Sequence, residues 1–166
     1  HIQTICDYLA APGGNIYIYC NAPGCNSPDE VVAACTSCLP EGITFNTQAQ
    51  IDNFQANYPG CTEIEGDVTI QGSNITNLNG LNVLTSIGGD LLIWSHYSLT
   101  SLTGLESLNS IGGDVLIFKN NLLTSLVGLD GLVTIGGNLT VGYAGYGNPA
   151  LTSLAGLEAL NNAGSA

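Results

Sequence analysis

The feature that most constrains this chain is a sequence repeat. The segment Ile-Gly-Gly-Asp, followed by a short apolar run, occurs at Ile87 and restarts 24 residues later at Ile111. Related copies begin at Ile64 and Ile135. Superposing the copies gives three apolar columns: Ile64, Ile87, Ile111 and Ile135; Val68, Leu91, Val115 and Leu139; and Ile70, Ile93, Ile117 and Val141. Apolar columns at a fixed period of this size are typical of a solenoid whose coils stack on one another.

The apolar spacing changes within each copy. After an alternating segment at residues 90–94, leucine recurs at every third position from Leu99 to Leu108. An α-helix has 3.6 residues per turn and would drift away from this spacing, whereas a coil that turns at glycine corners keeps it. The sequence therefore predicts an all-β protein with one or two short helices. The predicted architecture is a parallel β-solenoid of about four coils.

The region before the repeats has a different composition. Thr47–Gln50 is a capping box that opens a helix, with Ile51, Phe54 and Tyr58 on one side. We expect this helix to cover the apolar end of the first coil. The expected domains are a disulfide-stapled segment at 1–40, a cap helix at 41–60 and the solenoid at 61–166.

The cysteines are confined to the region before the repeats. They are even in number, as disulfide pairing requires: Cys6, Cys20, Cys25, Cys35, Cys38 and Cys61. Cys35 and Cys38 could also form half of a zinc site or a redox pair, but no second pair stands at zinc-finger spacing. Structural disulfides are favoured, and they indicate an oxidising compartment.

The charge of the chain excludes some partners. The net charge is −12, and Lys119 is the single Lys or Arg residue. Nucleic acids and anionic membranes would repel such a chain. No apolar run approaches the roughly 18 residues of a membrane span. Because the chain begins at His1 and contains no Met, we expect a mature extracellular protein whose signal peptide has been removed.

A family resemblance rests on two segments. Residues 38–43 read Cys-Leu-Pro-Glu-Gly-Ile, and residues 57–70 read Asn-Tyr-Pro-Gly-Cys-Thr-Glu-Ile-Glu-Gly-Asp-Val-Thr-Ile. Together they resemble the opening of receptor L domains, which occur in insulin and epidermal growth factor receptors. Similar leucine-rich repeats occur in secreted bacterial surface proteins. The resemblance covers about residues 38–160 and implies a right-handed parallel β-helix with a Cys38–Cys61 bridge. The coils here are more regular, and no ligand-binding residue can be carried over.

The predicted strands place apolar side chains on their outward face. The outward set is Leu92, Trp94, Leu116 and Phe118, with Tyr97, Tyr143 and Tyr146 at its border. A contiguous apolar patch on a solvent-facing surface usually marks an interaction site. Alternatively, the N-terminal segment folds over the patch and hides it.

Acidic residues also recur in columns. Asp67, Asp90 and Asp114 share one column with Asn138, while Asn82, Glu106, Asp130 and Glu158 share another. Calcium between carboxylates of neighbouring coils is one hypothesis, and a glycosidase acid pair is a more remote one. We favour a structural role, in which the Asp after Gly-Gly accepts backbone N–H groups and the second column faces solvent.

These observations favour a non-enzymatic extracellular structural or adhesive protein without a cofactor. We expect end-to-end self-association into a fibre, through an apolar edge formed by Leu151, Leu154, Leu157 and Leu160. One alternative is a monomeric receptor L domain-like module that binds a protein or glycan. A β-helix carbohydrate-active enzyme is the remote alternative, since no catalytic constellation stands out.

Overall fold

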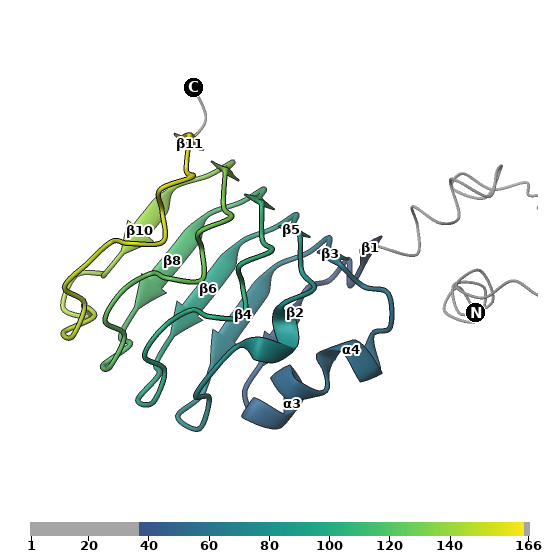
Figure 1. Ribbon diagram of the computed structural model, residues 1–166, viewed down its shortest axis with the longest axis horizontal. Helices are drawn as coiled ribbons and strands as arrows, with labels where there is room; N and C mark the ends of the chain where they lie inside the picture. Colours follow the sequence, from purple (N-terminus) through teal and green to yellow (C-terminus); the bar gives the residue numbers. More distant parts are fainter. Residues whose placement is uncertain (1–36, 165–166) are drawn as a thin grey trace, which may run out of the picture.

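The computed structural model describes residues 37–164, which form a β-solenoid of about five turns (Figure 1). One sheet has six two-residue strands: β1 Ser37–Cys38, β3 Glu63–Ile64, β5 Ser86–Ile87, β7 Ser110–Ile111, β9 Thr134–Ile135 and β11 Asn162–Ala163. The other has five strands: β2 Ile43–Phe45, β4 Val68–Gln71, β6 Leu91–Trp94, β8 Val115–Phe118 and β10 Leu139–Val141. Neighbouring strands in both sheets pair in parallel, which confirms the predicted fold class.

The stack has one turn more than the repeats predict. Strand β2 pairs with β4, so that Ile43 lies opposite Val68, and β1 pairs with β3. Residues 37–45 have no Gly-Gly pair, and no run of leucines at every third position follows them as in the later copies. Comparison of the sequence with itself therefore misses this first turn, although its backbone pairs in the same way.

The interior is filled by the predicted apolar columns. Side chains of β6 and β8 alternate, and the inward residues Leu91, Ile93, Val115 and Ile117 are fully buried. The leucines at every third position are also buried, from Leu99 to Leu108 in one coil. Each such buried side chain contributes about 1.5–3 kcal/mol of transfer free energy.

Consecutive turns explain the spacing of three. The N–H of Leu105 donates to Leu102 O at 3.2 Å, and the N–H of Leu108 donates to Leu105 O at 3.0 Å. Each hydrogen bond closes a β-turn that returns the next leucine to the interior. Gly104, with φ of 112°, occupies the third position of its turn, where a left-handed conformation is required. The stretch therefore forms joined turns and not a helix.

The capping box at Thr47 is confirmed, but the helix that follows is divided. The N–H of Gln50 donates to Thr47 Oγ1, and the backbone N–H of Thr47 donates to Gln50 Oε1. Helix α3, Gln48–Asp52, ends at Asn53, and α4, Phe54–Asn57, follows directly. Ile51 of α3 and Phe54 of α4 are fully buried.

The two helices lie at one end of the stack (Figure 1). Both contact the short 3₁₀ helix η1, Asn79–Leu81, and α3 also contacts β2. The side-chain oxygen of Gln48 accepts N–H groups from Thr76 and Asn77 at 2.8 and 3.2 Å. The helices therefore cover the leucine-lined side of the turn that follows β4, which is the first coil of the sequence repeat, as expected of a cap.

A disulfide joins Cys38 in β1 to Cys61, with the Cα atoms 5.7 Å apart. This confirms the pairing that the family resemblance implies, and it fastens the first turn to the second. It also removes Cys38 from the alternative zinc or redox site. Cys6, Cys20, Cys25 and Cys35 lie outside the described residues.

Candidate interaction surface

The outer face of the five-stranded sheet carries an apolar patch over β6 and β8. Leu92 pairs in register with Leu116, and Trp94 pairs with Phe118. All four side chains are half-buried, in alternation with the fully buried inner residues. We call these four residues the outer patch. Leu92 and Leu116 are flanked in the same register by Thr69 of β4 and Thr140 of β10, so the apolar character is confined to two strands.

An aromatic row runs along the outer patch. The rings of Trp94 and Phe118 stack with centroids 5.8 Å apart, and Tyr143 continues the row at 6.2 Å from Phe118. Tyr143 and Tyr146 form a small hairpin and are at least half exposed. Tyr97 is also half exposed, and no ring contact within residues 37–164 joins it to the row. The Nε1 atom of Trp94 is buried and has no hydrogen-bond acceptor within the described part of the chain.

The first acidic column connects the coils. Asp67 Oδ1 accepts the N–H of Asp90 at 2.8 Å, and Asp90 Oδ1 accepts the N–H of Asp114 at 2.7 Å. A Cβ atom at Gly113 would collide with Asp90 Oδ1. The second glycine of each Gly-Gly pair therefore leaves room for the carboxylate of the preceding coil. This hydrogen bonding explains the column without a bound cation.

The second acidic column acts within each coil. Glu106 Oε2 accepts the N–H of Gly104 at 2.9 Å, and Asp130 Oδ2 accepts the N–H of Gly128 at 2.7 Å. Glu158 repeats the arrangement with Gly156. All three carboxylates stabilise turns at exposed positions. Within the described range, no three His, Cys, Asp or Glu side chains are placed to hold a metal ion.

A ladder of buried polar side chains lies where the chain leaves β6 and β8, and the sequence-based prediction does not include it. His96 and Asn120 are fully buried. The ring nitrogens of His96 lie 2.9 Å from Gly72 O and 3.1 Å from Ile70 O, and the side chain of Asn120 donates to Ile93 O at 3.0 Å. Burial lowers the pKa of His96, while the two backbone carbonyls oppose that shift. Asn148 continues the ladder by donating to Ile117 O at 2.9 Å.

The signal for this ladder is present in the sequence but weak. His96 and Asn120 are 24 residues apart, in register with the repeat. Residues 143–149 form an inserted loop, and it moves the next member of the ladder to Asn148, 28 residues after Asn120. Different residue types and unequal spacing conceal the column. Its role is to satisfy backbone carbonyls where the chain leaves each long strand.

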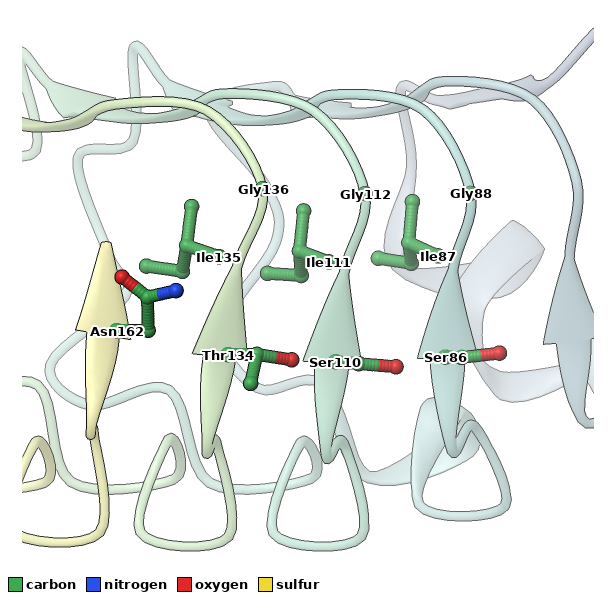
Figure 2. Close-up of a pocket in the computed structure, with 10 residues that line it drawn as sticks. All are labelled: Ser86, Ile87, Gly88, Ser110, Ile111, Gly112, Thr134, Ile135, Gly136 and Asn162. Carbon is green, nitrogen blue, oxygen red and sulfur yellow. The ribbon is translucent and has the colours of Figure 1, made fainter. Parts of the chain in front are cut away.

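A shallow groove follows the six-stranded sheet (Figure 2). Its volume is about 380 Å³. The hydroxyl groups of Ser86, Ser110 and Thr134 point the same way from successive strands, while Ile87, Ile111 and Ile135 point away from them (Figure 2). Because Gly88, Gly112 and Gly136 have no side chains, the groove has a bare backbone floor. The groove is regular and presents hydroxyl groups and backbone, whereas the outer patch presents large aliphatic and aromatic side chains.

The last coil is the least covered part of the leucine column. Leu154 is 59% exposed, whereas its counterpart Leu126 is 0% exposed. Leu151, Leu157 and Leu160 are half-buried and pack against the core. Strands β10 and β11 are the last strands of their sheets. This end is the predicted assembly end.

Comparison with known proteins agrees with this geometry. Residues 60–130 match the Receptor L domain family. A search of curated proteins and a search of solved structures find no match to the chain. Among the described residues, no helix is long and apolar enough to cross a membrane. The matched segment begins just before Cys61 and includes β3 to β8, and over these residues the chain is a receptor L domain-like β-solenoid.

Proposed function

We propose that this chain is a non-enzymatic extracellular adhesive module that binds a protein partner through the outer patch. The match to the Receptor L domain supports a binding role, because receptor L domains bind protein ligands. The Cys38–Cys61 disulfide supports an extracellular location, because disulfides persist in oxidising compartments.

The observation that carries the proposal is the change of residue type along one outward row. Thr69 and Thr140 occupy the row on the flanking strands β4 and β10, but Leu92 and Leu116 occupy it on β6 and β8. Threonine shows that a polar, strand-forming side chain suits this position. Together with the stacked rings of Trp94 and Phe118, the leucines make an interface core that a protein partner can cover.

The experiment compares two double variants on an array of purified extracellular proteins. Leu92→Thr/Leu116→Thr gives the patch the residue of the neighbouring strands and should abolish binding while leaving the circular dichroism spectrum unchanged. Ser86→Ala/Ser110→Ala alters the other sheet and should leave binding intact. Equal loss of binding in both variants, or retention in the first, would refute the proposal.

End-to-end assembly is a second candidate, and the exposed Leu154 favours it. The last coil offers to an incoming strand the same leucine surface that each earlier coil offers to the next. We propose that the N-terminal segment of another copy acts as an assembly arm at this end. The sequence predicts that this segment spans 1–40, but Ser37 and Cys38 form β1 of the solenoid, so the proposed arm is residues 1–36. The contact would be heterologous and would produce filaments.

Sedimentation analysis tests the assembly proposal. Leu154→Lys places a charge on the exposed edge and should abolish concentration-dependent association. Leu122→Lys, at a site that is 48% exposed outside the last coil, is the matched control. Deletion of residues 1–36 should likewise leave monomers. Association that persists in Leu154→Lys, or a wild-type protein that stays monomeric at high concentration, would refute the proposal.

A further inference from the structure

A second hollow lies beside the outer patch, at the inserted loop of the fourth repeat. It has a volume of about 470 Å³ and lies between Lys119 and Asn121 on one coil and residues 145–149 on the next. The N–H of Lys119 donates to Gly147 O at 3.0 Å. The N–H of Asn120 donates to Asn148 Oδ1, also at 3.0 Å. The hollow is therefore fixed by hydrogen bonds between neighbouring coils.

The hollow contains the single Lys or Arg residue of a chain with a net charge of −12. Lys119 has φ of 61°, a left-handed conformation that lysine rarely adopts. Its Nζ atom lies 5.0 Å from the centroid of the Tyr146 ring. No carboxylate in residues 37–164 forms an ion pair with Lys119, although acidic residues are abundant. Its charge is thus oriented by an aromatic ring and available to an anion.

Gly147 supplies an independent observation. Its φ is not positive, and a Cβ atom placed on it would meet nothing within 4 Å. Most glycines in the coils have a clear reason: Gly113, for example, would collide with the preceding coil if it carried a side chain. At Gly147 neither backbone conformation nor packing requires glycine. Because Gly147 lines the hollow and has no side chain, its backbone is open to close approach by a ligand.

The lining indicates the chemistry of that ligand. Asn121 and Tyr146 provide an amide and a phenol group, whereas the amide of Asn148 is already engaged with Asn120 and Ile117. Pro149 adds a flat surface, and no Leu, Ile or Val lines the hollow. A ligand with many hydroxyl groups can exploit such a lining, whereas an aliphatic peptide side chain would find little to cover it. The lone ammonium group favours a carboxylate on the same ligand.

We propose that this hollow binds an acidic sugar, with Lys119 pairing its carboxylate and the Tyr146 loop contacting the sugar ring. The site is distinct from the outer patch, and the proposal does not depend on protein binding there. An acidic sugar of a surface glycan would meet the module at the edge of its protein-binding face.

The test is an NMR titration of the full chain with glucuronate, glucose and N-acetylglutamate. Glucuronate should shift the backbone amide signals of Gly145–Asn148 at roughly millimolar concentration, with glucose and N-acetylglutamate at least about tenfold weaker. Lys119→Asn should weaken glucuronate binding roughly tenfold, the loss expected for one charge-assisted hydrogen bond. Since asparagine tolerates the left-handed conformation, this variant retains the fold.

Further variants separate a site from a general charge effect. Lys119→Arg should retain glucuronate binding, and Gly147→Val should block it by filling the hollow. Ser86→Ala on the other sheet should change nothing. Equal affinity for glucose would overturn the role of the carboxylate, and equal affinity for N-acetylglutamate would overturn the sugar. Absence of shifts at roughly tens of millimolar glucuronate would overturn the site itself.

Discussion

The two faces of β6 and β8 present the same kind of side chain to different surroundings. Leu91 and Ile93 point into the solenoid and are fully buried, whereas Leu92 and Trp94 alternate with them on the outer face and are half-buried. A sheet with one solvated face normally carries polar residues there. The inner apolar residues are explained by folding, because stacked coils need a core. The outer ones are not, and this difference leads to the proposal of an interaction surface.

The largest expected effect distinguishes the two faces by stability. Ile93→Ala removes a fully buried side chain and should lower the free energy of unfolding by about 2–5 kcal/mol. Leu92→Ala, one residue away on the outer face, should cost about 1 kcal/mol or less. Urea denaturation of the two variants measures both losses. Similar losses would show that the outer patch is part of the folding core.

A smaller effect should come from the hydrogen bonds that join the coils outside the core. Asp90→Ala removes the acceptor for the N–H of Asp114 and should destabilise the protein by about 1–3 kcal/mol. Asp90→Asn retains an acceptor oxygen and should lose less. If both variants unfold at the same denaturant concentration as the parent, the Asp column does not contribute to stacking.

The smallest expected effect is a pH dependence from the buried ladder. Burial lowers the pKa of His96 from its ordinary value of 6.5, so the folded protein resists the proton that the unfolded chain accepts. The contribution of His96 to stability is therefore fully present above about pH 6.5, the pKa of the unfolded chain. It is lost as the pH falls from there through the lower pKa of the folded protein.

The matched variant is His96→Asn, which places at this position the residue that the next coil carries at Asn120. Its thermal stability should lose this component of the pH dependence, while that of the carboxylates remains. An unchanged difference in melting temperature between pH 7 and pH 5 would contradict the assignment to His96.

Much of the fold can be predicted because aligning the copies of the repeat shows which positions are equivalent in successive coils. Columns such as Ile87, Ile111 and Ile135 show the inward positions directly, and the Thr47 capping box identifies the start of α3. The first turn is missed because parallel backbone pairing does not need the repeat's side chains. The division of the helix at Asn53 is missed because local backbone geometry, not residue periodicity, determines it.

The candidate sites are less accessible to sequence analysis. The outer patch follows from strand alternation, so its four members can be named in advance. The step of the ladder from Asn120 to Asn148 and the hollow at Lys119 depend on the inserted loop, which changes the spacing between coils. Side chains brought together by an insertion leave no periodic signal.

The fluorescence of Trp94 offers the most direct test of the central claim, that the outer patch is available to a partner. Trp94 is the single tryptophan of the chain and lies within the patch. Removing residues 1–36 should leave its emission maximum and its quenching by acrylamide unchanged. A shift to longer wavelength with stronger quenching would show that the protein's own N-terminal segment covers the patch, and the claim would be wrong.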